Sequence, residues 1–325
     1  MSAPSLEAAA RAAPVVPERY RALVERYPTL GLIGGTALFR VDATDLPRGR
    51  EVFAKAEWTN PGGSIKDRPV MRMLLEAVLE GELAPGRATR TVLDSSSGNA
   101  GIAYAMIGAM LGVPVELVVP GNASQERLKR IRAHGAQLVL TDPLEGYDEA
   151  LRTCHRRHEE HPERYFLCDQ YSNEHNWRAH YETTAAEILA QTGGRLTHFV
   201  AGIGTGGTIT GVGRRLKEHD PSIQVVAVIP EPFPGIEGLK PLDRPEDIRP
   251  AILDDGVIDA RIRVGIEDAF DHCGRLARRG VFVGQSSGAC LKAAEQVARE
   301  APGDARVVTV FADLGERYFS TRLWD

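Results

Sequence analysis

The sequence predicts an α/β protein with two domains, each built on a mostly parallel, twisted sheet covered by helices. One unit of pattern recurs along the chain: a short apolar run, a turn of glycine and small polar residues, and then a helical pattern. The apolar runs are continuous rather than alternating, which is typical of strands buried on both faces. The length of 325 residues also favours two domains, at about 150 residues each.

The expected elements follow in chain order. Residues 1–30 are expected to be helical and peripheral. Strands are expected at Thr91–Leu93, Val115–Val119, His198–Ala201, Gln224–Ile229, Val281–Val283 and Val307–Phe311. Helices are expected at Ala100–Leu111, Ser124–His134, Thr208–His219 and Ala289–Glu300. The proline-rich segment Pro230–Asp259 has no periodicity and is expected to form a long ordered loop. Ligands of such sheets bind at the carboxyl ends of strands, where the small polar turns lie.

Composition argues against several classes of partner. The net charge of −5 and the lack of a basic run make nucleic acid an unexpected partner. No stretch approaches the roughly 20 apolar residues of a membrane span. The N-terminus lacks the basic start and apolar stretch of a signal peptide, so a cytoplasmic location is expected. Four cysteines without a Cys-x-x-Cys pair favour reduced thiols.

The first candidate site is Asn60-Pro61-Gly62-Gly63-Ser64-Ile65-Lys66-Asp67. Ser64 and Asp67 have the spacing of a capping box, which predicts a helix start with Lys66 in its first turn. The positive field of a helix N-terminus disfavours an ammonium group and favours an amine nucleophile. A solvated surface lysine beside a turn is the alternative for Lys66.

The second candidate site is Asp94-Ser95-Ser96-Ser97-Gly98-Asn99-Ala100. Backbone N–H groups and hydroxyls at a helix start make an anion site that suits a carboxylate. An ordinary serine-rich turn that caps a helix is the alternative.

The third candidate site is Gly202-Ile203-Gly204-Thr205-Gly206-Gly207-Thr208, between a strand and a helix. Glycines let the backbone approach a phosphate, which the N–H groups and threonine hydroxyls can bind. Its glycine spacing also satisfies the dinucleotide fingerprint, with Glu231 near the place of the acidic residue. An NAD site is the alternative, although NAD gives Lys66 no role.

Two more polar turns complete the set. Gly284-Gln285-Ser286-Ser287-Gly288 follows an apolar run, and Asp169-Gln170-Tyr171-Ser172-Asn173 follows another. A serine helix cap and an ordinary polar loop are the respective alternatives. The pattern Gly-x-Ser-Ser-Gly also allows a hydrolase serine, but no partner histidine is evident.

The segment around Lys66 resembles the lysine motif of the cysteine synthases (O-acetylserine sulfhydrylases) and their fold-type II relatives, which bind pyridoxal 5'-phosphate (PLP). This resemblance implies a tryptophan synthase β-like fold, with Lys66 joined to PLP as a Schiff base and then moving the substrate α-proton. It also implies that PLP phosphate is bound by Gly204, Thr205, Gly206, Gly207 and Thr208, and that Ser286 contacts the pyridine nitrogen.

The resemblance assigns the substrate carboxylate to Ser96, Ser97, Gly98 and Asn99, with Gln170 reaching it from the other side. The Asn99 side chain would also contact the ring hydroxyl of PLP. A neutral hydroxyl at Ser286 suits β-elimination and replacement better than transamination. The sequence departs from the family at Ala100, where many members carry threonine, so the substrate stays open.

The implied function is a β-replacement transferase that makes L-cysteine from O-acetylserine or O-phosphoserine and a sulfur donor. Alternatives inside the family are condensation of serine with homocysteine, as in cystathionine β-synthase, and synthesis of a diaminopropionate precursor. A catalytically silent ligand-binding relative is a further alternative, which the intact Lys66 disfavours.

The expected organisation is a smaller substrate-closing domain at 47–154 and a larger PLP-anchoring domain at 1–46 and 155–325. A homodimer is expected from the resemblance. No metal is expected. The series Cys154-His155-x-x-His158-x-x-His161 has metal-like spacing, but the charged residues between them indicate a solvated helix face.

Overall fold

The computed structural model describes residues 9–87, 90–242, 247 and 249–325. They form two compact units. Unit 1 consists of the described residues within 1–15, 34–60 and 177–325, and unit 2 consists of those within 16–33 and 61–176. These bounds differ from the expected 47–154 division because residues 50–56 pair within the sheet of unit 1, and residues 165–167 pair within that of unit 2.

Unit 1 contains a seven-stranded sheet in the order β1-β2-β3-β11-β8-β9-β10. Its strands are β1 (Ala9–Ala10), β2 (Leu38–Arg40), β3 (Arg50–Ala56), β8 (His198–Gly202), β9 (Gln224–Pro230), β10 (Ala260–Val264) and β11 (Ala305–Phe311). The pairs β1–β2 and β2–β3 are antiparallel and the others are parallel. Of the parallel strands, β8, β9 and β11 carry the continuous apolar runs that require cover on both faces.

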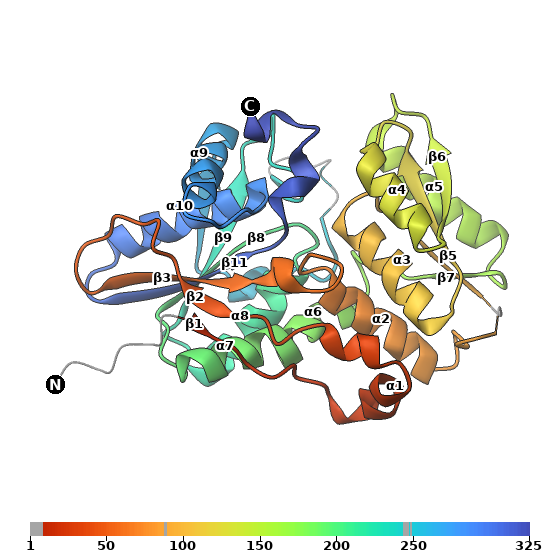
Figure 1. The fold of residues 1–325 in the computed structure, drawn as a ribbon, viewed down its shortest axis with the longest axis horizontal. Helices are drawn as coiled ribbons and strands as arrows, with labels where there is room; N and C mark the ends of the chain where they lie inside the picture. The colour runs from red at the N-terminus through yellow and green to blue at the C-terminus, as the bar shows by residue number, and fades with distance from the viewer. Residues whose placement is uncertain (1–8, 88–89, 243–246, 248) are drawn as a thin grey trace. The chain divides into compact units, whose positions relative to one another are not determined.

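Helices cover both faces of this sheet (Figure 1). Helices α9 (Ile266–Ala277) and α10 (Gln285–Glu300) lie on one side, and α7 (Ala185–Thr192) and α8 (Gly207–His219) lie on the other. Successive residues of a strand face opposite sides of the sheet. Val226 and Val228 of β9 pack with α10, and the residues next to them in the strand face the other side. A π-helical turn at His180–Thr184 precedes α7.

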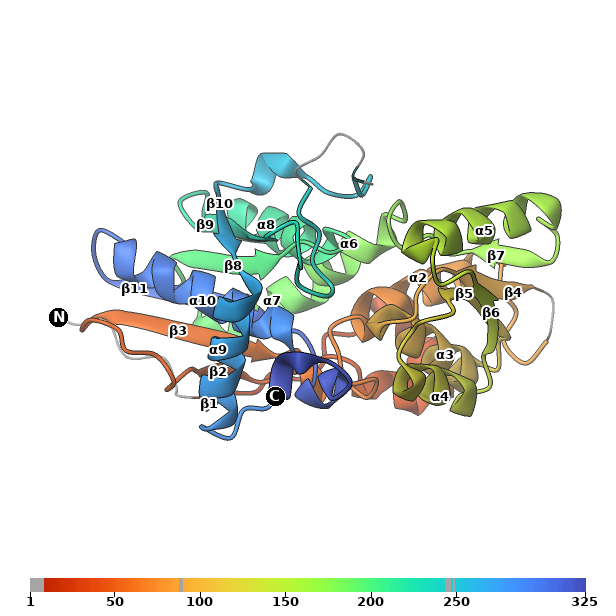
Figure 2. The same ribbon diagram turned by 90° about the horizontal axis from the view of Figure 1, so that it is seen from above.

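Unit 2 contains a four-stranded, fully parallel sheet in the order β6-β5-β4-β7. The strands are β4 (Thr91–Asp94), β5 (Val115–Pro120), β6 (Gln137–Thr141) and β7 (Tyr165–Leu167). Figure 2 shows α5 (Gly146–Glu160) on one side of the sheet, and α3 (Asn99–Leu111) and α4 (Gln125–Ala133) on the other. Helices α1 (Arg21–Arg26) and α2 (Asp67–Leu79) complete the unit, and α6 (His175–Ala179) spans the boundary between the units in sequence.

The predicted α/β class with mostly parallel sheets is confirmed, and so are most of the expected strands and helices. Two expectations are wrong. Val281–Val283 forms no strand beyond a single bridge between Val283 and Leu314. The N-terminal segment is not peripheral throughout, since Tyr20 and Leu30 are buried in the core of unit 2. In the described part of Pro230–Asp259, the only helix or strand after the end of β9 is the 3-10 turn Asp255–Val257, as the loop prediction requires.

A buried ion pair lies at the centre of unit 1. Lys55 of β3 and Glu187 of α7 have no exposed side-chain surface, and their Nζ and Oε2 atoms are 2.6 Å apart. Lys55 also donates to the backbone oxygen of Thr36 at 2.7 Å, and Glu187 accepts from the backbone N–H of Gly35 at 2.9 Å. A buried charge is stable only when it is paired and hydrogen-bonded, so this network ties three distant segments together.

Replacing one partner of this pair should destabilise the protein strongly. In Glu187→Gln the buried ammonium group of Lys55 loses its counter-ion, and the expected cost is about 3–5 kcal/mol in the free energy of unfolding. Urea denaturation followed by circular dichroism measures it. The matched control is Asp268→Asn, which breaks the more exposed pair with Lys292 and should change little. Equal midpoints for the two variants would contradict the role given to the buried pair.

Candidate active site

Lys66 lies at the N-terminus of α2 in unit 2. It occupies the position directly before the first helical residue, Asp67, and its backbone oxygen accepts from the N–H of Val70. Its side chain is only partly exposed, and the residues on either side, Ile65 and Asp67, are buried. The alternative of a fully solvated surface lysine is therefore not supported by the structure.

The predicted capping box is not the device that starts this helix. The hydroxyl of Ser64 accepts from the N–H of Lys66 at 3.3 Å, and the Asp67 carboxylate accepts from the N–H of Gly62 at 2.5 Å. A Cβ atom on Gly62 would lie 2.2 Å from Oδ1 of Asp67, so glycine is needed for this close approach. Asp67 thus closes the Gly62–Gly63 turn back onto the helix start and fixes the loop that carries Lys66.

The predicted carboxylate loop joins β4 to α3, also in unit 2. The hydroxyl of Ser96 accepts from the N–H groups of Gly98 at 3.3 Å and Gly101 at 3.2 Å. A Cβ atom on Gly101 would lie 2.1 Å from the Ser96 backbone oxygen, whereas one on Gly98 would meet nothing within 4 Å. The Gly98 position therefore borders open space at the amino end of α3, where a helix attracts an anion.

Ser97, Gly98 and Asn99 are partly exposed at this helix start, whereas Ala100 is buried in the apolar core of unit 2. The Ala100 methyl group adds no hydrogen-bond donor to the loop. The anion-binding capacity of this variant motif therefore depends on the serines and on backbone N–H groups.

Gln170 lies beside the same loop. Its backbone N–H donates to Oδ2 of Asp94 at 3.3 Å, and its backbone oxygen accepts from Nδ2 of Asn176 at 2.7 Å. The preceding residue, Asp169, has a positive φ of 44°. Such a φ is uncommon for a residue with a side chain and marks a tight turn. Gln170 and the Ser96–Asn99 loop are thus brought together within unit 2.

The predicted phosphate loop joins β8 to α8 in unit 1. Gly206 has a φ of +83° and is the N-cap of α8. Cβ atoms on Gly204 and Gly206 would lie 2.6 Å from the Gly238 backbone oxygen and 2.9 Å from Cβ of Leu253, respectively. These two positions accept only glycine, which leaves the loop N–H groups and the Thr205 and Thr208 hydroxyls as its polar groups.

The hydroxyl of Thr208 contacts a buried histidine that sequence reasoning did not single out. Oγ1 of Thr208 is 3.3 Å from Nε2 of His180, and Nδ1 of His180 is 2.9 Å from Oγ1 of Thr184. His180 lies in the π-helical turn, a type of distortion that often occurs at functional sites. The histidine therefore fixes the orientation of one polar group of the phosphate loop.

The two serines at the start of α10 differ in their surroundings. Ser287 is fully buried, and its hydroxyl accepts from the N–H of Ala312 at 3.0 Å, so it has a structural role. Ser286 is partly exposed and makes no side-chain hydrogen bond within the described residues. Ser286 is therefore the serine of this pair that can serve a ligand.

The two units divide the predicted site residues between them. Unit 2 carries Lys66, the Ser96–Asn99 loop and Gln170, and unit 1 carries the Gly204–Thr208 loop and Ser286. These groups fit PLP in kind: an amine at a helix N-terminus for the aldehyde, a glycine loop at a second helix N-terminus for the phosphate, and a neutral hydroxyl for the ring nitrogen.

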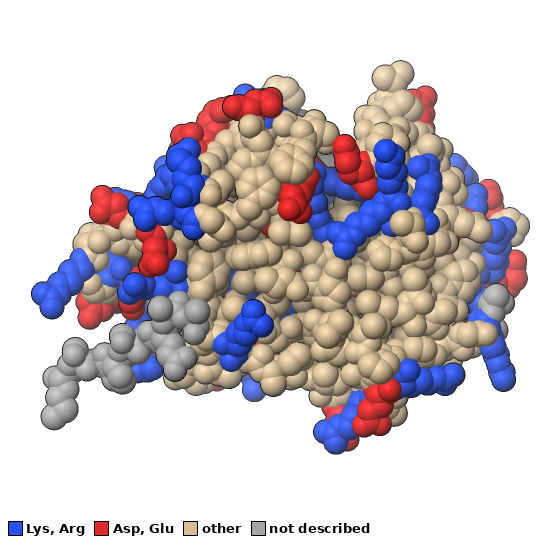
Figure 3. Space-filling view, in the orientation of Figure 1, with Lys and Arg blue, Asp and Glu red and all other residues tan. Residues whose placement is uncertain are grey.

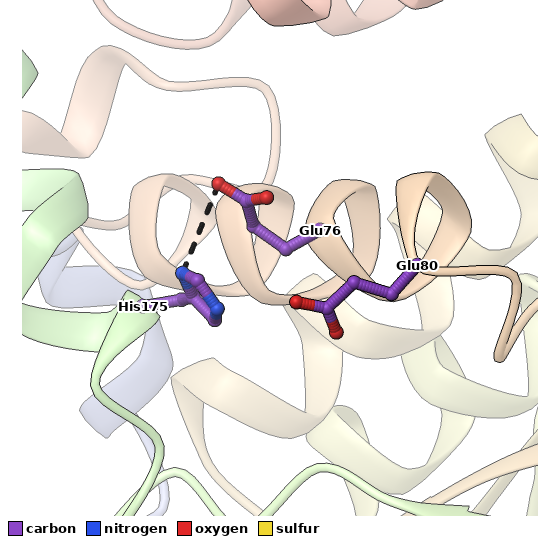
Figure 4. Close-up of side chains that lie close together, drawn as sticks. All are labelled: Glu76, Glu80 and His175. Atoms are coloured by element: carbon purple, nitrogen blue, oxygen red, sulfur yellow. Dashed lines mark ion pairs between the residues drawn. The ribbon is translucent and has the colours of Figure 1, made fainter.

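One group of possible metal ligands occurs among the described residues: Glu76, Glu80 and His175 (Figure 4). Glu76 already accepts hydrogen bonds from Tyr20 and Arg19. Although burial opposes it, these bonds hold the pKa of Glu76 below its ordinary value. Glu76 is thus engaged by protein donors. In the Cys154–His161 series, Cys154 is buried in an apolar cluster, away from solvent. All four cysteines are free and buried.

Comparisons with known proteins identify the family of the chain. Residues 29–313 match the family model described as pyridoxal-phosphate dependent enzyme. A cysteine synthase of Aquifex aeolicus is 50% identical over 307 residues, which is 92% of each chain.

Solved structures of relatives share the fold. O-ureido-L-serine synthase is 38% identical with a TM-score of 0.84, over 91% of this chain and 94% of that chain. An O-acetylserine dependent cystathionine β-synthase from Helicobacter pylori is 33% identical with a TM-score of 0.81, over 91% of this chain and 98% of that chain. These matches confirm the fold that the resemblance implied, and the chain belongs to the cysteine synthase family of pyridoxal-phosphate dependent enzymes.

Proposed function

We propose that this protein is a PLP-dependent β-replacement enzyme that makes L-cysteine from an O-activated serine and a sulfur donor. The observation that carries the proposal is Lys66, held at a helix N-terminus in a chain that is 50% identical to a cysteine synthase. The polar strand-end loops of both sheets support it, since they supply the groups that such a cofactor and an amino acid need.

Each candidate residue has a proposed task. Lys66 binds the cofactor aldehyde and later takes the proton from the substrate Cα atom with its Nζ atom. The N–H groups and hydroxyls of Gly204, Thr205, Gly206, Gly207 and Thr208 bind the cofactor phosphate. Asn99 contacts the ring hydroxyl. When bound, PLP supplies the electron withdrawal that weakens the Cα–H bond of the substrate.

The substrate is oriented through its carboxylate. Ser96, Ser97, Gly98 and Asn99 supply hydroxyl and backbone donors at the start of α3, and Gln170 approaches from the neighbouring loop. After Lys66 takes the Cα proton, the Cβ–O bond breaks and acetate or phosphate leaves. The sulfur nucleophile then adds to Cβ, and Lys66 returns the proton to Cα. Ser286 faces the ring nitrogen with a neutral hydroxyl, which limits electron withdrawal and favours β-replacement over transamination.

A second candidate function uses the same site with another nucleophile. It is favoured by Ala100, which replaces a threonine frequent in the family, and by solved relatives named O-ureido-L-serine synthase and O-acetylserine dependent cystathionine β-synthase. The diaminopropionate-precursor reaction belongs to the same class. The nucleophile therefore needs a direct assay rather than inference from the fold.

We further propose that small molecules rather than nucleic acid are the partners, and that the protein works in the cytoplasm. The net charge is −5, and Figure 3 shows acidic side chains among the basic ones on the face drawn. Within the described residues, no helix is long and apolar enough to cross a membrane. The proposed division of labour assigns PLP anchoring to unit 1, the larger unit, and substrate closing to unit 2.

The family relationship also supports a homodimer. Light scattering of the purified protein after gel filtration should give twice the chain mass of 35.4 kDa. A mass of 35.4 kDa at micromolar concentration would contradict this proposal.

Removal of the amine should separate cofactor chemistry from folding. Lys66→Ala should lose both the visible absorbance of lysine-bound PLP and all turnover, because no other group takes the α-proton. Adding O-acetylserine and then O-phosphoserine to the wild type, while the cofactor absorbance is followed, identifies the activated serine. Lys292→Ala is the control, because Lys292 is partly exposed, whereas Lys55 is buried in an ion pair whose loss should destabilise the protein. Turnover by Lys66→Ala would sink the assignment.

A side chain added to the Gly204–Thr208 loop should weaken the binding of PLP. Gly204→Ala places a Cβ atom against the Gly238 backbone oxygen, and such overpacking costs about 1–3 kcal/mol. The dissociation constant of PLP should therefore rise roughly tenfold to hundredfold, as measured by titrating the apoprotein. In the control Gly303→Ala the new Cβ atom meets nothing within 4 Å, and affinity should not change. Equal affinities would remove this loop from the phosphate site.

A further inference from the structure

Asp94 is a buried carboxylate at the carboxyl end of β4, directly before the Ser95–Asn99 loop. It accepts three hydrogen bonds. Its Oδ1 accepts from the N–H of Ser95 at 2.6 Å, and its Oδ2 accepts from the hydroxyl of Tyr104 at 2.5 Å and from the N–H of Gln170 at 3.3 Å. One side chain therefore links the start of the carboxylate loop to Gln170.

Two neighbouring hydrogen bonds further restrict the loops that Asp94 joins. The hydroxyl of Tyr147 on α5 donates to the Ser95 backbone oxygen at 2.5 Å, and Nδ2 of Asn173 donates to the Cys168 backbone oxygen at 3.0 Å. Hydrogen bonds thus hold the Ser95–Asn99 loop and the loop of Gln170, and the position of one loop relative to the other depends on the Asp94 carboxylate. No residue of the proposed chemistry needs Asp94 as a proton donor or acceptor.

We propose that Asp94 is a positioning residue for the amino-acid substrate, which holds the Ser96–Asn99 loop and Gln170 at the separation that one substrate carboxylate requires. The inference rests on the proposed function and names the residue that sets substrate affinity in it. Only the ionised carboxylate offers acceptors to three donors at once, since a proton on either oxygen removes one acceptor.

The protonation state of Asp94 changes in the working range of pH. Burial, with a smaller contribution from the nearby Asp169 carboxylate, raises the pKa of this carboxyl to about 7, although the hydrogen bonds from Tyr104, Ser95 and Gln170 lower it. The titratable groups that face it come from α3, α5 and the segment after β7: Tyr104, Tyr147, Cys154, Cys168, Asp169 and Tyr171. Burial raises the pKa values of these phenols and thiols, so they stay neutral near pH 7.

The test is Asp94→Asn in the PLP-loaded, full-length protein. The asparagine side chain has the same shape as that of aspartate, but its NH2 group donates where a carboxylate oxygen accepted. One of the three hydrogen bonds that Asp94 accepts is therefore lost. The KM of the O-activated serine should rise about tenfold while kcat changes less than about threefold. Binding of L-alanine, which has the amino and carboxylate groups without a leaving group, should weaken by the same factor when followed by cofactor absorbance.

Two further variants separate positioning from general destabilisation. Glu116→Gln alters another buried carboxylate of the same sheet, which binds Arg157 and Tyr165, and should leave KM and L-alanine binding unchanged. Tyr104→Phe keeps both backbone bonds to Asp94 and should raise KM much less than Asp94→Asn.

The pH profile gives a signature that a structural role would not produce. In the wild type, KM should rise as pH falls below about 7, because protonation of Asp94 removes an acceptor. This dependence should disappear in Asp94→Asn. It should move to higher pH in Tyr104→Phe, since the hydrogen bond from Tyr104 lowers the pKa of Asp94.

The outcomes are distinct. An active wild type in which Asp94→Asn matches Glu116→Gln in KM, L-alanine binding and pH profile overturns the positioning role and leaves the proposed function intact. A fall in kcat without a change in KM also overturns it. A wild type with no turnover of any O-activated serine and no response to L-alanine overturns the proposed function, and this inference with it.

Discussion

A buried ion pair links the larger sheet to the segment that precedes Lys66 in the chain. Lys55 lies in β3 with no exposure to solvent, so it must be met by Glu187 and the Thr36 oxygens. Thr36 in turn donates to Glu57, and Glu57 accepts from the amide of Asn60 at 2.9 Å. Asn60 begins the segment that leads to Lys66. A chain of hydrogen bonds therefore connects the buried Lys55 ammonium group, which must be paired, to Asn60.

Unit 2 contains a buried negative charge, the carboxylate of Asp94, that is likewise stabilised by hydrogen bonds. Asp94 is buried at the end of a parallel strand, where Tyr104 and the backbone N–H groups of two loops donate hydrogen bonds to it. Parallel strands covered on both faces leave their polar groups at the carboxyl ends. The candidate site residues of both units accordingly lie in loops that follow strands, and in unit 2 the buried Asp94 carboxylate binds two of these loops.

The sequence predicted those parts of the fold whose signal is local. Continuous apolar runs identified β4, β5, β8, β9 and β11, and glycine and serine turns located the loops after them. The strand β3 was not predicted, because Lys55 and Glu51 break its apolar pattern and the partner of Lys55 lies 132 residues away. The edge strand β10 was missed because arginines alternate with its apolar residues, so it lacks the continuous apolar run of the buried strands.

In the candidate site, too, the sequence predicted only those residues that have a local signal. Lys66, the glycine loop and the serine turns could be found because each has a compact motif. Asp94, Tyr104 and His180 could not, since their importance lies in contacts between segments distant in sequence. The capping box at Ser64 and Asp67 was wrong because Asp67 turns back to the N–H of Gly62, a contact that only a glycine at that position permits.

Borohydride reduction followed by peptide mass spectrometry tests most directly whether Lys66 carries the cofactor. Reduction fixes PLP to whichever lysine holds it. The reduced phosphopyridoxyl group is expected on Lys66 and on no other lysine. Its presence on a different lysine, or its absence from a protein that retains PLP absorbance, would contradict the account.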